Sequence, residues 1–330
     1  MIKVAINGFG RVGRATFKIA LTKKNLKVVA INDLGDIENL AYLLQYDTAH
    51  GRFDKSVKVS GKNLVVGGKQ FPFFSIADPA KLPWKKHQVD VALECTGAFR
   101  KTADVKKHLK AGAKNVILSA PIKDEGIATV VRGVNDKDTK KLNAVANASC
   151  TTNCVSPIMA VLDSAFGVEK AMLSTVHAVT SSQRTVDLAD EKDWRRGRSI
   201  LGNIIPTTTG AAIATGKVIP SLQGKFDGMS IRVPMITGSL IDVVALLKEN
   251  VTEAQVNSAF KKYSKMAHFK GVLEVTEDEL VSSDIIGTTA SAIVDLKFTK
   301  VVDGNLVKII AWYDNEWAYS HRLVEMAEKI

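Results

Sequence analysis

The sequence predicts two domains: an α/β domain with a parallel sheet in the first half of the chain, and a domain with a mostly antiparallel sheet in the second half. The chain has 330 residues, a length that one ordinary hydrophobic core does not accommodate. Its hydrophobic share of 46% is that of a globular protein. In the first half, apolar runs typical of buried strands alternate with amphipathic runs typical of helices, as in a parallel sheet. Beyond Cys150 this alternation stops, and several strand-like runs follow.

Composition and charge exclude some classes of protein. No run approaches 18 uninterrupted apolar residues, so we expect no membrane span. Three cysteines, an odd number, argue against a disulfide framework, and no export signal precedes the first strand-like run, so we expect a cytoplasmic protein. The net charge of +11 is scattered along the chain. It favours attraction of small anions over a dedicated nucleic-acid site. We predict no metal site.

The first predicted strand leads into a glycine-rich turn. Residues 3–7 read as a buried parallel strand, 15–22 as a helix and 27–31 as a second strand. Between the first strand and the helix stands Gly8-Phe9-Gly10-Arg11-Val12-Gly13, in the context that a dinucleotide-binding fingerprint requires.

Each part of this fingerprint has an expected task. Gly8 makes the tight turn, Gly10 lets the backbone approach a pyrophosphate, and Gly13 lets the helix pack closely on the strand. Asp33 lies 20 residues beyond Gly13, where a carboxylate can accept hydrogen bonds from both ribose hydroxyls.

The first domain continues with a helix near 37–44, a β meander over 56–74, strands at 89–94 and 115–118, and a helix at 103–111. The two strands end beside Thr96-Gly97 and Ser119. Because the carboxyl ends of strands form the ligand crevice of an open α/β sheet, these three residues are candidate cofactor contacts.

The second domain begins with a helix at about 155–166 and a strand at 171–176. The long polar segment 178–203 suggests a functional loop or an interface arm. Later patterns predict antiparallel strands at 229–235, 240–247, 290–298 and 306–313, with helices at 253–264 and 315–330. The last helix could pack back on the first domain.

Cys150 lies between a β-prone run, 142–146, and the helix expected from about Val155. Unpaired amides and the macrodipole at a helix N-terminus lower the pKa of a thiol, which favours a nucleophilic thiolate. The hydroxyls of Ser149 and Thr151 could cap the helix or donate to an anion. A cysteine between small residues can also be a simple packing residue.

Five motifs then occur in order: Ile6-Asn7-Gly8-Phe9-Gly10-Arg11-Val12-Gly13-Arg14, Ala148-Ser149-Cys150-Thr151-Thr152-Asn153-Cys154, Thr175-Val176-His177, Thr207-Thr208-Thr209-Gly210-Ala211-Ala212 and Trp312-Tyr313-Asp314-Asn315-Glu316. Over essentially its whole length the chain resembles phosphorylating glyceraldehyde-3-phosphate dehydrogenases. The resemblance implies a Rossmann NAD-binding domain (1–149, with helix 315–330 packed back on it), an α+β catalytic domain (150–314) and a homotetramer.

The resemblance also implies a chemistry. Cys150 attacks the aldehyde of D-glyceraldehyde 3-phosphate, His177 acts as base, and NAD oxidises the hemithioacetal to a thioester that inorganic phosphate cleaves to 1,3-bisphosphoglycerate. Cys154 is implied to be non-catalytic. Anion contacts fall on Ser149, Thr151, Thr180, Thr209, Gly210 and Arg232, with one of Arg195, Arg196 or Arg198 in addition. Cofactor contacts fall on Gly8, Gly10, Arg11, Val12, Asp33, Thr96, Gly97, Ser119 and Asn315.

Asp33 favours NAD, because a carboxylate repels a 2′-phosphate and the next residue, Leu34, offers no cation to bind one. Apolar Leu188 also fits the family's NAD-type pattern, whereas Ala189 stands where such members often have proline. Three alternatives stay open: erythrose-4-phosphate dehydrogenase activity, which hydrolyses its thioester, an additional nucleic-acid-binding role, and a catalytically inactive homologue. Met235–Ser239 departs from the family pattern near an expected subunit interface. The resemblance leaves glycolytic or gluconeogenic direction open.

Overall fold

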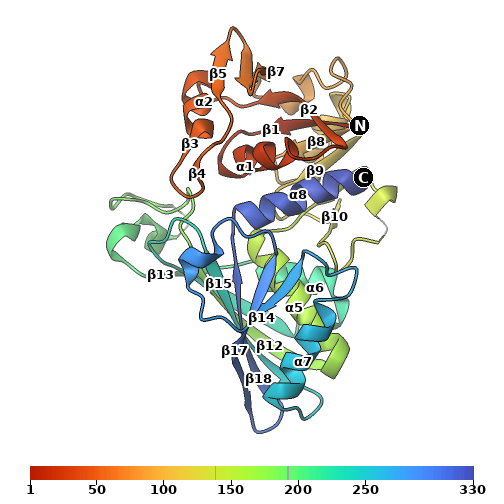
Figure 1. Cartoon of the computed structure of the whole chain (residues 1–330), viewed down its shortest axis with the longest axis vertical. Coiled ribbons are helices and arrows are strands. Elements are labelled where there is room, and N and C mark those ends of the chain that lie inside the picture. The colour runs from red at the N-terminus through yellow and green to blue at the C-terminus, as the bar shows by residue number, and fades with distance from the viewer. Residues whose placement is uncertain (138, 192) are drawn as a thin grey trace. The chain divides into compact units, whose positions relative to one another are not determined.

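The computed structural model describes residues 1–137, 139–191 and 193–330. The chain divides into two compact units, drawn in Figure 1. Unit 1 contains Met1–Val130, Asp136–Ala148 and Tyr319–Ile330, and unit 2 contains Val131–Asn135 and Ser149–Ala318. The sequence did not assign residues 131–135 to the second domain.

Unit 1 is built on a sheet with the strand order β10-β11-β9-β8-β1-β2-β7-β6-β5. Neighbours from β10 to β7 pair in parallel, and β5, β6 and β7 form the antiparallel meander at one edge. The strands are β1 (Ile2–Asn7), β2 (Leu26–Asn32), β5 (Val57–Ser60), β6 (Asn63–Val66), β7 (Lys69–Phe74), β8 (Val91–Glu94), β9 (Asn115–Leu118), β10 (Ala128–Thr129) and β11 (Ala144–Ala146). A small separate hairpin pairs β3 (Tyr46–Asp47) with β4 (Gly51–Arg52).

In the sequence, four of the α-helices described in unit 1 lie between strands of its sheet, and the fifth is the last helix of the chain. They are α1 (Arg11–Ala20), α2 (Ile37–Gln45), α3 (Thr102–Val105), α4 (Lys107–Lys110) and most of α8 (Trp317–Lys329). The central strand β1 is fully buried at Val4, Ala5 and Ile6, as expected of a parallel strand covered on both faces. The predicted Rossmann-type α/β domain is therefore confirmed.

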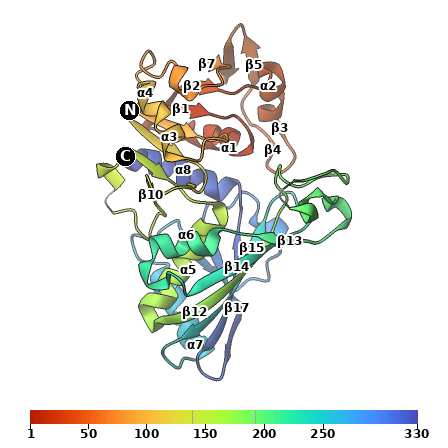
Figure 2. The same ribbon diagram turned by 180° about the vertical axis from the view of Figure 1, so that it is seen from behind.

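Unit 2 contains a sheet with the order β13-β14-β12-β15-β18-β17-β16, mostly antiparallel. Its strands are β12 (Val168–His177), β13 (Ile205–Thr208), β14 (Phe226–Arg232), β15 (Ser239–Leu247), β16 (Leu273–Thr276), β17 (Ala292–Val302) and β18 (Leu306–Tyr313). Helices α5 (Cys150–Phe166), α6 (Ala211–Val218) and α7 (Glu253–Tyr263) lie along one side of it (Figure 2). The predicted α+β class of this domain is confirmed.

Several elements differ from the sequence-based expectation; helix α1, for example, was expected over 15–22 but begins at Arg11. Helix α5 begins at Cys150, five residues before its apolar stripe, because Ser149 caps a first turn made of polar residues. The helix expected over 103–111 is interrupted at Lys106. Strand β14 was expected to be antiparallel, but it pairs in parallel with β12 and antiparallel with β13.

In the ranges that the structure describes, none of the helices combines the length and the apolar character that crossing a membrane demands.

Candidate active site

Cys150 is the first residue of the long helix α5. The amide of Thr152 donates to the Ser149 hydroxyl (3.1 Å), which fixes the N-terminus of the helix. Ala148, just before the cap, has φ +54°, a left-handed conformation that alanine rarely adopts. The sulfur is thereby held at the positive end of the helix dipole.

His177 ends strand β12, and its ring faces this sulfur. The distance between Cys150 Sγ and His177 Nε2 is 3.4 Å. Cys150 is partly exposed and His177 is buried. The structure thus brings together two residues, far apart in the sequence, that the motifs predicted to be nucleophile and base.

Burial is the largest influence on the pKa values of the Cys150 thiol and the His177 ring. It raises the pKa of the Cys150 thiol, while the Arg232 guanidinium and hydrogen bonds from Thr151 oppose the rise. The sequence led us to expect a lowered thiol pKa from the helix terminus alone, so the direction of the net shift corrects that expectation. Burial, with the nearby Arg232 charge, lowers the pKa of His177 to about 3. The imidazole is therefore neutral at neutral pH and can accept a proton.

The other ring nitrogen of His177 has two possible partners. Nδ1 lies 2.7 Å from the Ala178 carbonyl oxygen, which can only accept, and 2.5 Å from Arg232 Nη1, which can only donate. When Nδ1 carries the hydrogen, it donates to Ala178, and Nε2 presents a lone pair to the sulfur. When Nε2 carries the hydrogen, Nδ1 accepts from Arg232. Both neutral tautomers have a partner, so the ring can act as base or as donor.

Arg232 is brought to this position by the sheet. It ends β14 and lies opposite His177 in the parallel pairing of β14 with β12. Nη1 donates to the Ala178 carbonyl (2.9 Å), whereas the buried Nε has no partner among the described residues. A buried, unpaired guanidinium nitrogen beside the reactive sulfur suits an anion.

Arg196 is one of the three loop arginines that the sequence offered as anion contacts. Its positive charge contributes to the lowered pKa of Arg232. Arg196 Nε donates to the Thr207 hydroxyl (2.8 Å), and its guanidinium also pairs with Asp193 (3.3 Å). Arg198 instead pairs with Asp187 (2.9 Å), and both side chains are largely exposed.

Tyr313 is a residue of this site to which sequence reasoning gave no role. Its hydroxyl lies 3.0 Å from the hydroxyls of both Thr151 and Thr175, and its ring packs edge-on against His177. It thereby ties helix α5 to strand β12. Burial raises the pKa of Tyr313, so it stays protonated. Its only signal in the sequence was its place within the motif Trp312-Tyr313-Asp314-Asn315-Glu316.

The remaining predicted anion contacts lie at turns and helix ends. Thr180 bonds to Ser182 (2.8 Å) and Gln183 (3.1 Å) in the loop after β12, and Thr209 accepts from the Ala211 amide (3.2 Å) at the start of α6. Gly210 is the N-cap residue of α6. The Thr151 hydroxyl is buried against Tyr313.

Asn315 is held by its side-chain oxygen. That oxygen accepts from Ser239 (2.9 Å) and Thr237 (3.3 Å), so the amide nitrogen is the group that can donate to a ligand. Asp314, which the sequence did not single out, accepts from the amides of Glu316 and Trp317 (2.8 Å each) and fixes this turn.

In unit 1 the glycine turn has the geometry of the dinucleotide fingerprint. Gly8 has φ +93°, and a Cβ there would lie 2.6 Å from the Thr96 amide nitrogen. A Cβ on Gly13 would lie 2.0 Å from the Gly8 carbonyl oxygen, whereas one on Gly10 would meet nothing within 4 Å. The open space at Gly10 is where a pyrophosphate could approach the backbone, so these residues fit NAD.

The other predicted cofactor residues surround this turn. Asp33 accepts from the amides of Phe9 (2.5 Å) and Gly35 (2.8 Å), which orient its carboxylate. Arg11 and Val12 open α1, and Arg11 pairs with Asp47 (2.8 Å). Thr96 and Gly97 follow β8, and Ser119 follows β9.

Comparisons with known proteins point to one family. Residues 2–102 match the family model described as glyceraldehyde 3-phosphate dehydrogenase, NAD binding domain, and residues 149–315 match its C-terminal domain. The chain is 49% identical to a glyceraldehyde-3-phosphate dehydrogenase of Geobacillus stearothermophilus, covering 100% of this chain and 98% of the relative. It is 50% identical to that of Streptomyces coelicolor (98% and 97% covered) and 44% identical to glyceraldehyde-3-phosphate dehydrogenase 2 of Kluyveromyces marxianus (100% and 99%).

Proposed function

The chain belongs to the glyceraldehyde-3-phosphate dehydrogenase family and is an NAD-dependent oxidoreductase, and we propose that it converts D-glyceraldehyde 3-phosphate and inorganic phosphate to 1,3-bisphosphoglycerate. We assign most of the NAD contacts to unit 1, and the covalent chemistry together with Asn315 to unit 2. The observation that carries the proposal is the 3.4 Å approach of His177 Nε2 to Cys150 Sγ at a helix N-terminus.

His177 Nε2 takes the thiol proton as Cys150 Sγ adds to the aldehyde carbon. The ring then returns that proton to the aldehyde oxygen, which gives the hemithioacetal hydroxyl. NAD, when bound, supplies the hydride acceptor for its oxidation. His177 takes the hydroxyl proton of the hemithioacetal as the hydride leaves, and a thioester remains on Cys150. A phosphate oxygen then attacks the thioester carbonyl, and the Cys150 thiolate leaves. Aldehyde, NAD⁺ and phosphate thus yield acyl phosphate, NADH and one proton.

Two anions need binding groups, the phosphate of the substrate and the attacking phosphate. We assign Arg232 as a binding group for these anions, because its buried Nε has no hydrogen-bond partner in the described chain and can donate to an anion oxygen. We assign the second guanidinium to Arg196, whose charge acts on Arg232. Ser149, Thr151, Thr180, Thr209 and Gly210 offer hydroxyls and an amide, which suit tetrahedral anions.

NADH formation from glyceraldehyde 3-phosphate, with phosphate, NAD and NADP varied in turn, tests this function. We expect turnover to depend on phosphate and to favour NAD over NADP, since Asp33 repels a 2′-phosphate. Turnover that is indifferent to phosphate, with erythrose 4-phosphate the better aldehyde, would favour the alternative dehydrogenase instead.

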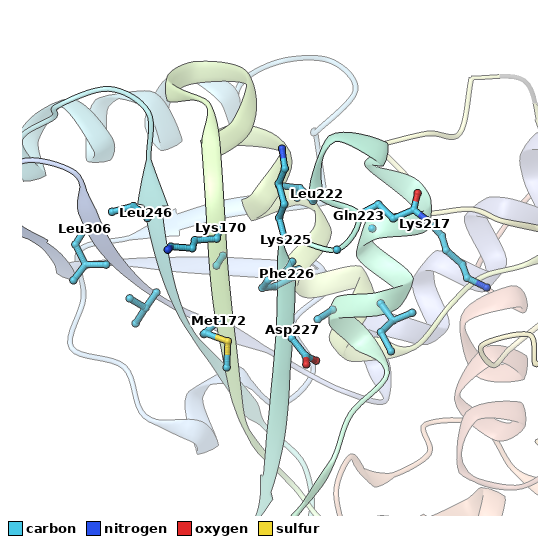
Figure 3. A pocket seen from close by; sticks show the side chains of 16 residues that line it. Lys170, Met172, Lys217, Leu222, Gln223, Lys225, Phe226, Asp227, Leu246 and Leu306 are labelled. Atoms are coloured by element: carbon cyan, nitrogen blue, oxygen red, sulfur yellow. The ribbon is translucent and has the colours of Figure 1, made fainter.

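We further propose that the protein is a homotetramer. A cavity of about 700 Å³ on unit 2 is lined by Met172, Leu246 and Leu306 (Figure 3), and Met172 is 61% exposed. In the long polar segment, Trp194 is 87% exposed. Apolar surface of this kind marks protein interfaces, and other copies of the chain would cover it. Sedimentation velocity should give the mass of four chains, and the mass of one chain would contradict this.

We place the protein in the cytoplasm, because all three cysteines of the described chain are unpaired, as in a reducing compartment.

A further inference from the structure

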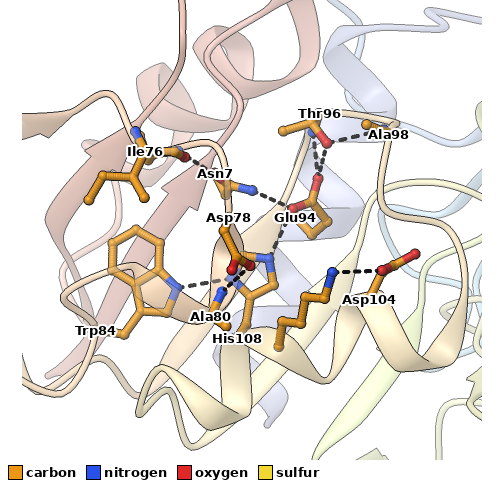
Figure 4. Close-up of polar contacts among 12 residues, drawn as sticks. Asn7, Ile76, Asp78, Ala80, Trp84, Glu94, Thr96, Ala98, Asp104 and His108 are labelled. Carbon is orange, nitrogen blue, oxygen red and sulfur yellow. Dashed lines mark hydrogen bonds and ion pairs between the residues drawn. The ribbon is translucent and has the colours of Figure 1, made fainter.

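A buried row of polar side chains joins the carboxyl ends of three neighbouring strands in unit 1. Asn32, Asn7 and Glu94 end β2, β1 and β8, and they lie opposite one another in the parallel pairing. Asn32 Nδ2 donates to Asn7 Oδ1 (2.7 Å), and Asn7 Nδ2 donates to Glu94 Oε2 (2.5 Å; Figure 4). All three side chains are buried, Glu94 completely. The mechanism above uses none of them.

Glu94 is surrounded by hydrogen-bond donors. Oε2 accepts from Asn7 and from His108 Nε2 (2.9 Å), and Oε1 accepts from the Thr96 amide (2.8 Å) and the Thr96 hydroxyl. Four donors fill the acceptor positions of a carboxylate. Burying a carboxylate without hydrogen-bond donors costs folding free energy, so the folded state requires all four donors in place.

Trp84 determines which nitrogen of His108 faces Glu94. The indole Nε1 of Trp84 donates to His108 Nδ1 (2.9 Å). An indole can only donate, so Nδ1 must be the acceptor, and Nε2 carries the hydrogen that points at Glu94. Trp84 and His108 are completely buried. A chain of donors thus runs from Trp84 through His108 to the carboxylate, as Figure 4 shows.

The other end of this network is the backbone of the turn that follows β8. The Thr96 hydroxyl donates to Glu94 and accepts from the Ala98 amide (3.1 Å), so it spans Gly97, whose φ is +70°. Asn7 immediately precedes Gly8, and the amide of Gly8 donates to the Asn32 carbonyl (2.7 Å). Two of the residues that donate to Glu94 are therefore part of the predicted cofactor turns or next to them: Thr96 belongs to one turn, and Asn7 precedes the other.

We propose that Glu94 is a positioning residue for NAD: its carboxylate, oriented by His108 and Trp84, fixes the turns at Gly8 and at Thr96–Gly97 in the form that binds the dinucleotide. This inference rests on the proposed function, because it assumes that these two turns contact NAD. Glu94 itself faces the protein interior and acts through Asn7 and Thr96.

The test is Glu94→Gln in the full-length protein. The amide keeps the shape of the side chain but turns one acceptor oxygen into a donor, so Thr96 or the Asn7–His108 pair loses its acceptor. We expect the Kd for NAD, measured by calorimetric titration without aldehyde, to rise about tenfold. At saturating NAD we expect kcat and the KM for the aldehyde to stay within about twofold of the wild type.

Asp90→Asn is the matched control. Asp90 precedes β8 at its opposite end, where it accepts from the Lys3 amide (2.8 Å) and pairs with Lys114 (2.8 Å). The same chemical change there can cost stability, which a denaturant titration of both variants measures, but it should leave the Kd for NAD unchanged. An equal loss of NAD affinity in both variants would overturn the positioning role.

Trp84→Phe keeps the inference testable if Glu94→Gln does not fold. Without the indole donor, His108 is no longer restricted to the tautomer that donates to Glu94, and we expect about a threefold rise in the Kd for NAD. If Glu94→Gln folds and binds NAD with wild-type affinity, the positioning role is overturned and the proposed function stands. If Glu94→Gln does not fold, wild-type affinity in Trp84→Phe has the same meaning. A wild-type protein that binds no NAD would instead overturn the proposed function.

Discussion

Replacing Cys150 by serine is expected to lower kcat for NADH formation by at least about 10³-fold. A serine hydroxyl at this position is a far weaker nucleophile at neutral pH, and it cannot form the thioester that phosphate cleaves. The helix N-terminus, His177 and Arg232 are all arranged around the sulfur, and they would surround a group that does not react. Steady-state NADH absorbance with saturating aldehyde, NAD and phosphate measures the loss.

Cys154→Ser is the control for this substitution. Cys154 lies one helical turn further on, completely buried in the core of unit 2, and burial raises the pKa of its thiol well above the usual value. The proposed mechanism gives Cys154 no role, so Cys154→Ser should retain most of the activity. Equal losses in the two variants would contradict the assignment of Cys150 as the nucleophile.

His177→Asn is expected to lower kcat by about 10²–10⁴-fold. Asparagine can still donate a hydrogen bond toward the sulfur, but it cannot take the proton of the hemithioacetal hydroxyl. Because burial and the Arg232 charge lower the pKa of His177, the wild-type ring is neutral at neutral pH and has a lone pair for that proton. Stopped-flow measurement of the first NADH turnover isolates this step from phosphate attack.

His268→Asn is the matched control, since His268 is an exposed histidine of unit 2 whose ring packs on Phe269. It should leave the first turnover unchanged. A first turnover in His177→Asn as fast as in the wild type would remove His177 from the mechanism and leave Cys150 without an identified base.

The sequence predicted the parts of the fold that depend on local patterns. Continuous apolar runs such as 3–7 identified the buried parallel strands, and the glycine spacing identified the turn between β1 and α1. The apolar stripe alone put the start of α5 near Val155, five residues late, because a stripe does not report a polar first turn. The expected position of Cys150 at the helix N-terminus and the possible cap at Ser149 are confirmed. The parallel partner of β14 was missed, because strand pairing is a long-range property that periodicity does not encode.

The predicted roles within the site depended mainly on family motifs. Cys150 and His177 could be named because each lies in a short, specific motif, and the distance between them needed the structure. Tyr313 and Glu94 could not be assigned from the sequence, because their partners are distant in it. Tyr313 lies 138 positions from Thr175 and 162 from Thr151. Glu94 lies 87 positions from Asn7. The direction of the Cys150 pKa shift also needed the structure, since burial outweighs the helix terminus.

The most direct measurement is of the covalent intermediate. One equivalent each of glyceraldehyde 3-phosphate and NAD is mixed with the protein without phosphate, the reaction is quenched in acid, and the peptides are fragmented in a mass spectrometer. We predict an acyl group on Cys150, one NADH formed per acylated chain, and loss of the acyl group as acyl phosphate when phosphate is added before the quench. NADH formed with no acylated cysteine, or with the acyl group on Cys154 or Cys95, would contradict the mechanism.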